Sequence, residues 1–224
     1  MLRMISKHLL LALSTGLLLG SLHSAAQAEA DKGLLIDGHV TQLPVTQLEG
    51  SQLDIASVKG WKVLYFWSDS CPCVKRCEQL NFIPISKQYR NQVSVFGIAA
   101  NSANIRYRPT QEQGKAGELP LLRVGGGIGG GSGFWPPYPV VVDSRHKVAN
   151  LLGASYTPET FLFNPDNQLV FRGVPDDSKD YEERTGKPGL TQNYLRDALN
   201  EALAGKKVTR PTVSSKGFCA IDRS

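Results

Sequence analysis

One stretch of the 224-residue sequence constrains the fold more than any other: residues 62–77, which read KVLYFWSDSCPCVKRC. Residues 63–67 form an unbroken aliphatic and aromatic run, which predicts a strand covered on both faces. The polar residues 68–70 end this run, and Cys71 follows at once. Pro72 then stands where a helix would begin, because proline is tolerated at the first helical position. Three of the four cysteines therefore lie at or just after a strand-to-helix turn.

This position has chemical consequences for Cys71. Unpaired backbone N–H groups and the positive end of the helix dipole stabilise a thiolate at a helix N-terminus. Lys75 and Arg76 add positive charge in the first turns. The thiolate is the nucleophile of disulfide exchange and the ligand of soft metals, so Cys71 is predicted to be the most reactive thiol. The alternative interpretation is that the cysteines form only a static disulfide.

The first residues have the pattern of a secretory signal. Arg3 and Lys7 precede an apolar stretch at residues 9–19, and Ala26-Gln27-Ala28 fits the small-x-small cleavage rule. We therefore expect a signal peptide at residues 1–28 and an exported protein, which for a bacterial chain is periplasmic. The apolar stretch is short for a span of about 20 residues, so membrane association is expected only through an uncleaved signal.

Composition excludes some partners and favours chemical roles for the cysteines. The net charge of +5 is mild, and no Lys/Arg cluster alternates with aromatic residues, so a nucleic-acid partner is not expected. All four cysteines follow the predicted signal peptide. Export allows disulfides to form, but so few cysteines in so long a chain do not make a disulfide scaffold.

The rest of the chain alternates between strand and helix patterns. These patterns predict strands at 34–36, 40–43, 93–99 and 139–143, a hairpin of 157–163 with 168–173, and helices at 145–152 and 193–204. Pro84 should kink or split the helix after Cys71, and Thr191 is expected to cap the last helix. Residues 173–189 read as a polar loop. The pattern predicts an α/β fold with a mixed central sheet flanked by helices.

One domain accounts for most of the chain. We expect it to cover residues 34–204, with a glycine-rich insertion at about 114–138, followed by a C-terminal tail at 205–224 that carries Cys219. The glycines at 125–133 match a dinucleotide-binding pattern only formally, because no strand leads into them and no Lys-Ser/Thr completes a phosphate loop. A surface loop is the better interpretation.

Two segments resemble the thioredoxin superfamily. Residues 66–71, FWSDSC, resemble the strand and turn that carry its first active-site cysteine, and Thr157-Pro158 matches the place of its cis-proline. The chain departs from the usual Cys-x-x-Cys motif, since Val74 replaces the second cysteine. Tyr65 stands where thioredoxins usually carry a buried acid.

The motifs over residues 34–219 are similar to redoxin, or peroxiredoxin-like, exported thioredoxin-family proteins. This resemblance implies a thioredoxin-like fold. It also implies that Trp67, Thr157 and Pro158 bind substrate beside the nucleophile. A cis X–Pro bond would expose a backbone edge that can pair with an extended substrate.

The leading hypothesis is thiol–disulfide oxidoreduction without a cofactor. Cys71 attacks a disulfide and a second cysteine resolves the mixed disulfide. Cys73 is slightly favoured as the resolver and Cys219 comes next. Cys77 is a further candidate, and the alternative for it is a pair with Cys73. The expected partners are protein or small-molecule disulfides and a thiol electron donor.

Two alternatives remain open. The first is a thiol peroxidase of the peroxiredoxin kind, in which Ser68 matches the motif but Leu64 replaces its proline, and Thr157-Pro158 lies near the place of its arginine. The second is binding or delivery of Cu(I) by Cys73 and Cys77, since thiolates suit this ion. His39 and His146 are not placed to complete such a site. Otherwise no metal is expected.

Overall fold

The computed structural model describes residues 33–47, 50–68, 71–101, 136–187, 189–215 and 217–224. The predicted signal peptide and most of the predicted glycine-rich insertion lie outside these residues. Among the helices that are described, none is both long and apolar enough to cross a membrane.

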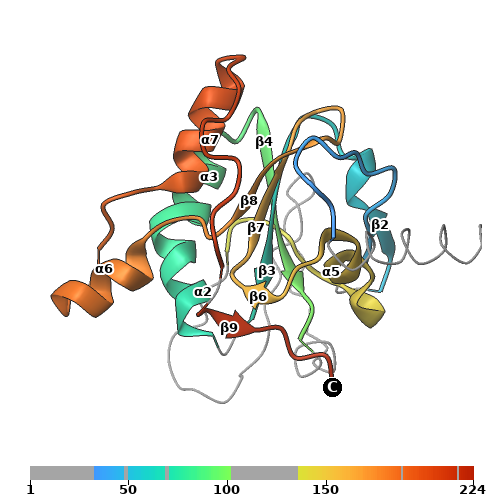
Figure 1. The fold of residues 1–224 in the computed structure, drawn as a ribbon. Helices are drawn as coiled ribbons and strands as arrows, with labels where there is room; N and C mark the ends of the chain where they lie inside the picture. Colours follow the sequence, from blue (N-terminus) through green and yellow to red (C-terminus); the bar gives the residue numbers. More distant parts are fainter. Residues whose placement is uncertain (1–32, 48–49, 69–70, 102–135, 188, 216) are drawn as a thin grey trace, which may run out of the picture.

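A seven-stranded mixed sheet forms the centre of the molecule, with strand order β2-β1-β5-β4-β3-β7-β8 (Figure 1). Its strands are β1 Pro44–Thr46, β2 Gln52–Asp54, β3 Trp61–Trp67, β4 Val93–Ala99, β5 Val140–Val142, β7 Thr160–Phe163 and β8 Leu169–Gly173. Strand β3 pairs in parallel with β4 and antiparallel with β7, and β4 pairs in parallel with β5. This confirms the predicted mixed sheet and the predicted hairpin.

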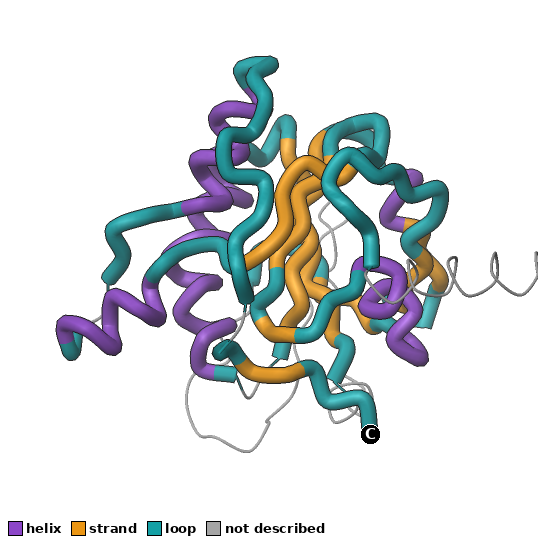
Figure 2. The backbone as a smooth tube through the Cα atoms, viewed as in Figure 1, coloured by secondary structure: helices purple, strands orange, loops and turns teal. Residues whose placement is uncertain are grey.

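Helices cover both faces of the sheet (Figure 2). They are η1 Ile55–Ser57, α2 Pro72–Cys77, the π-helix η2 Glu78–Phe82, α3 Ile83–Gln88, η3 Ser144–His146, α5 Lys147–Leu152, α6 Ser178–Thr185 and α7 Tyr194–Leu203. Helices α2, α3 and α7 pack on one face, α5 packs on the other, and α6 lies beside α2 (Figure 1).

Strand β3 shows why the apolar run at residues 63–67 was informative. Its side chains alternate between the two faces of the sheet. Val63 and Tyr65 belong to the core beneath α2 and α7, whereas Leu64 and Phe66 belong to the core beneath α5. All four side chains are fully buried. The strand is therefore covered on both faces, as the run predicted.

The helical segment after Cys71 is divided, as predicted from Pro84. Proline has no N–H to donate, and its ring clashes with the carbonyl four residues earlier in a regular helix. A π-helical turn, η2, precedes α3, and Pro84 stands in the first turn of α3. The wider turn accommodates the proline without ending the helical run.

Three other predictions were wrong. Residues 34–43 form a turn rather than two strands, with only an isolated bridge from His39 to Gln168. Residues 173–189 contain α6, whose polar helix is supported by the Lys179–Glu183 ion pair and by an ion pair of Arg76 with Glu182. Helix α7 is capped by Asn193, whose side chain accepts from the Arg196 N–H, whereas the Thr191 side chain pairs with Asp177.

Candidate functional site

Cys71 occupies the predicted turn between β3 and the helical run. It is the N-cap residue of α2, with Pro72 directly after it, and its carbonyl oxygen accepts from the Val74 N–H at 3.1 Å. The residue is only 3 % exposed. The sulfur therefore sits at the positive end of the helix dipole and largely out of solvent.

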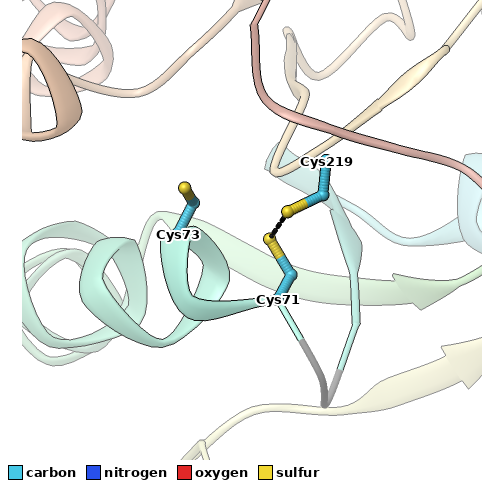
Figure 3. Close-up of side chains that lie close together, drawn as sticks. All are labelled: Cys71, Cys73 and Cys219. Carbon is cyan, nitrogen blue, oxygen red and sulfur yellow. Dashed lines mark hydrogen bonds between the residues drawn. The ribbon is translucent and has the colours of Figure 1, made fainter.

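The C-terminal tail brings Cys219 to Cys71 across 148 sequence positions. Strand β9, Cys219–Ala220, pairs antiparallel with β6, Tyr156–Thr157. This places the Cys219 sulfur 2.7 Å from the Cys71 sulfur (Figure 3). The sulfur of Cys73 completes a cluster in which all three sulfurs lie within 4.8 Å of one another. All three cysteines are free thiols, because a disulfide bond would be about 2.05 Å long.

Thr157 and Pro158 lie beside this cluster, where the resemblance expected them. The Thr157–Pro158 peptide bond is cis. The Thr157 carbonyl oxygen is 3.5 Å from the Cys71 sulfur, and the Thr157 hydroxyl donates to the Cys219 carbonyl at 3.4 Å. Thr157 thus contacts both cysteines of the close pair.

The three clustered cysteines have pKa values shifted in different directions. The neighbouring Cys73 thiol has the largest effect: with a weaker contribution from Cys219, it lowers the pKa of Cys71 to about 5, although burial opposes the shift. The same interaction between Cys71 and Cys73, together with burial, raises the pKa of Cys73 far above its ordinary value. Burial, and then the hydrogen bond with Cys71, raises the pKa of Cys219 to about 11. At neutral pH Cys71 is the thiolate, and its two neighbours hold protons.

The other two predicted site residues face elsewhere. Cys77 is buried in the core, where desolvation is the largest cause that raises its pKa and where it contacts Asp176 and Ser178. The Trp67 side chain is also largely buried, and its indole N–H donates to Glu78 at 3.1 Å. The structure does not bring Cys77 into the sulfur cluster, and the substrate-binding role of Trp67 stays a prediction.

Glu78 is a buried residue near the site that was not predicted from the sequence. Its carboxylate accepts from the Tyr65 hydroxyl at 2.7 Å and from the Trp67 indole, and it is only 6 % exposed. Burial raises its pKa, although both hydrogen bonds oppose the shift. Tyr65 stands at the sequence position where thioredoxins usually carry a buried acid. In this structure its hydroxyl group is hydrogen-bonded to a different buried acid, Glu78. The available signal was a charge on the inward face of the helix, one turn after Val74.

The chemistry of the cluster suits exchange between sulfurs and also soft metal ions. Three sulfurs within 4.8 Å of one another form a donor set that fits Cu(I) better than a hard cation. This set consists of Cys71, Cys73 and Cys219, whereas the predicted copper pair was Cys73 with Cys77. The alternative of copper binding therefore moves to a different group of thiols.

A low-pKa cysteine at a helix N-terminus, a cis-proline beside it and a central mixed sheet define a thiol-based redox protein of thioredoxin-like fold. Residues 36–172 match the AhpC/TSA family, and the chain belongs to that family. It is thus a redoxin of the thioredoxin superfamily, as the motifs predicted.

Solved structures agree on the fold. An uncharacterized conserved protein from Geobacillus kaustophilus is similar with 23 % identity and a TM-score of 0.60, over 84 % of this chain and 92 % of that chain. A hypothetical protein from Sinorhizobium meliloti 1021 is similar with 18 % identity and a TM-score of 0.59, over 86 % of this chain and 96 % of that one. At these identities the likeness concerns the fold alone. The comparison with curated proteins found no match.

Proposed function

We propose that this redoxin is an exported thiol–disulfide oxidoreductase in which Cys71 is the nucleophile and Cys219 the resolving cysteine. The observation that carries the proposal is the 2.7 Å contact between the two sulfurs, one of low pKa at a helix N-terminus and one on the docked tail. The contact favours Cys219 over Cys73 as the resolving cysteine.

The exchange balances in two steps. The Cys71 thiolate attacks one sulfur of a substrate disulfide, so that a Cys71–substrate disulfide forms and the other substrate sulfur leaves as a thiolate. Cys219, once deprotonated, attacks the Cys71 sulfur, and the remaining substrate sulfur leaves. The substrate gains two electrons and the protein holds a Cys71–Cys219 disulfide. An external thiol donor returns the protein to its reduced form.

The accessible sulfur of that disulfide is expected to be Cys219. Cys71 is buried, whereas Cys219 is partly exposed. A thiol of lower pKa is also the better leaving group. The donor thiolate therefore attacks Cys219 and expels Cys71, with its pKa of about 5.

Disulfide mapping tests this assignment. Reduced protein is exposed to one equivalent of a small disulfide, quenched by alkylation, digested and analysed by mass spectrometry. Wild type should give a Cys71–Cys219 linkage, and Cys219→Ser should accumulate the mixed disulfide on Cys71. A Cys71–Cys73 linkage in wild type, with Cys219 alkylated, would transfer the resolving role to Cys73. The absence of any linkage at Cys71 would refute the proposal.

Membership of the AhpC/TSA family favours a second candidate, thiol peroxidase. In that reaction the Cys71 thiolate attacks a hydroperoxide, the O–O bond breaks, an alcohol leaves, and a sulfenic acid forms on Cys71. Cys219 then condenses with it and releases water. Stopped-flow consumption of hydrogen peroxide separates the two candidates. A rate constant at least a hundredfold above that of free cysteine would favour the peroxidase, and a rate constant like that of free cysteine would favour the exchange reaction.

A further inference from the structure

The C-terminal tail lies on the edge beside the cis-proline, close to the nucleophile. Strand β9 lies beside β6 (Figure 1). Their antiparallel register sets Cys219 opposite Thr157 and Ala220 opposite Tyr156. The Ile221 N–H extends the pairing by donating to the Ser155 carbonyl at 2.9 Å. An extended segment of the chain therefore already uses the exposed hydrogen-bonding groups of this edge.

The register has a chemical consequence. The residue opposite Thr157 presents its side chain to the Cys71 sulfur, and in this molecule that residue is Cys219, at 2.7 Å. Any extended polypeptide that paired with β6 in the same way would present its own cysteine at the same place. Backbone pairing with an open strand edge is a general way of binding extended peptides, and it requires the edge to be free.

Contacts after β9 hold the tail in this position. Ile221 is 7 % exposed and packs with the core cluster of the α5 face. The Asp222 N–H donates to the Asn101 side chain at 2.9 Å, and the Arg223 guanidinium donates to the Ala154 carbonyl at 2.5 Å. Residues 221–224 thus form a docked segment, in which Ile221 is the buried side chain.

We propose that β9 acts as an internal substrate, occupying the edge on which a polypeptide disulfide would dock. This inference rests on the proposed function, and it names the substrate class. With the tail docked, Cys71 exchanges with small disulfides, which reach it past the partly exposed residues Cys73 and Cys219. A polypeptide disulfide reacts only after the tail leaves β6.

The test compares two full-length proteins that differ only in how firmly the tail is docked. Both carry Cys73→Ser and Cys219→Ser, so that Cys71 is the reactive thiol and no cysteine near it resolves the product. One protein also carries Ile221→Asp, which places a charge at the buried position that follows β9. Each is mixed with oxidised glutathione, or with a ten-residue extended peptide whose central cysteine is disulfide-bonded to glutathione. Mixed-disulfide formation at Cys71 is followed by mass spectrometry.

The Ile221→Asp protein should react with the peptide at least tenfold faster than its partner, and with oxidised glutathione less than twofold differently. Equal peptide rates in the two proteins would overturn the proposal. If neither protein reacts with either disulfide, the proposed function itself fails, and the role of the tail is decided by a second measurement.

That measurement uses the unaltered sequence. Amide hydrogen exchange is recorded on the reduced wild-type protein, with and without the same peptide carrying serine in place of its cysteine. Exchange at Cys219 and Ile221 should accelerate as the peptide takes the edge, whereas exchange at Val141 in the central strand β5 should not change. Unchanged exchange at Ile221 up to millimolar peptide would overturn the proposal, whether or not the Ile221→Asp variant folds.

Discussion

At the scale of single residues, the three clustered sulfurs divide protons among themselves. Cys71, with a pKa of about 5, is ionised at neutral pH, and Cys219, with a pKa of about 11, is not. A thiol with the ordinary pKa of 9.0 would be only about 1 % ionised at pH 7, whereas Cys71 would be about 99 % ionised. In the proposed exchange reaction, Cys71 therefore needs no separate base, and Cys219 must lose its proton only after Cys71 has reacted.

Alkylation of Cys71 should follow this ionisation. We expect the iodoacetamide rate at Cys71 to have its midpoint near pH 5 and to level off by about pH 7. Cys73→Ala removes the largest cause that lowers this pKa, so the midpoint should move upward and the rate at pH 6 should fall several-fold. Peptide mass mapping of alkylation against pH measures both. Cys77→Ala is the matched control and should leave the midpoint in place. A wild-type midpoint between pH 8 and 9 would contradict the prediction.

At the scale of elements, Glu78 links the π-helix η2 to strand β3 through Tyr65 and Trp67. Its pKa is higher in the folded protein than the ordinary value of 4.5, because the carboxylate is buried. Such a group favours folding while it is protonated, below about pH 4.5, and this contribution is lost as the pH rises through its folded pKa. Keeping Glu78 buried therefore costs more folding free energy at neutral pH, where its carboxyl group is ionised, than at pH 4.5.

Glu78→Gln keeps an oxygen that accepts from both donors and removes the charge. The free energy of unfolding in urea is measured for this variant and for wild type at pH 4.5 and at pH 7. The value for the variant minus the value for wild type should be about 1–2 kcal/mol higher at pH 7 than at pH 4.5. Glu183→Gln serves as the control, because Glu183 is exposed and loses only an ion pair with Lys179. Its difference from wild type should stay within about 0.5 kcal/mol. A difference for Glu78→Gln that is the same at both pH values would refute the argument.

The tail also packs against the sheet before it reaches β9. Arg172 in β8 exchanges backbone hydrogen bonds with Pro211 and Val213, and Gly173 follows with φ +135°. A Cβ at Gly173 would lie 2.0 Å from the Val213 carbonyl oxygen, whereas a Cβ at Gly205, with φ +71°, would meet nothing within 4 Å. The two glycines share a positive φ and differ in crowding.

Gly173→Ala should therefore lower the free energy of unfolding by about 2–4 kcal/mol, since it strains the backbone and also displaces residue 213. Gly205→Ala should cost about 1–2 kcal/mol, from the left-handed conformation alone. Urea unfolding of both variants gives the comparison. If both variants lose the same free energy of unfolding, Val213 moves away from the new Cβ without an energetic cost. The path of the tail over β8 would then not depend on Gly173.

Local patterns predicted the elements better than the site. The apolar run at residues 63–67 identified β3 because a strand buried on both faces favours a continuous apolar run over alternation. Helix α6 was missed because it is polar and held by ion pairs rather than by an apolar face. Cys219 could only be one candidate among three, because its place depends on the pairing of β9 with β6, which no local pattern encodes. Glu78 lay on the inward side of a predicted helix, and its partners came from a strand.

At the scale of the whole molecule, the Cys71–Cys219 pair joins the central turn to the end of the chain. The two residues are 148 positions apart, so a disulfide between them would close most of the described fold into one loop. In the chain-entropy treatment a loop of this length stabilises the folded state by about 5 kcal/mol, as an upper value. Redox state and global stability should therefore be linked, with the oxidised protein unfolding at the higher urea concentration.

The size of this redox effect should depend on pH. A group whose pKa is lowered by folding adds stability above its unfolded pKa and loses it as the pH falls through its folded pKa. For reduced protein this means that the Cys71 thiolate adds stability as the pH rises from about 5 towards the ordinary value of 9.0, whereas the oxidised protein has no such group. The gap between oxidised and reduced protein should consequently be wider at pH 5 than at pH 8. Urea unfolding of both forms at the two pH values measures it. The control is Cys219→Ser, which cannot form the Cys71–Cys219 disulfide and should have the same free energy of unfolding with and without mild oxidant. If the difference between oxidised and reduced wild type widens as the pH rises, Cys71 is not ionised in the folded state.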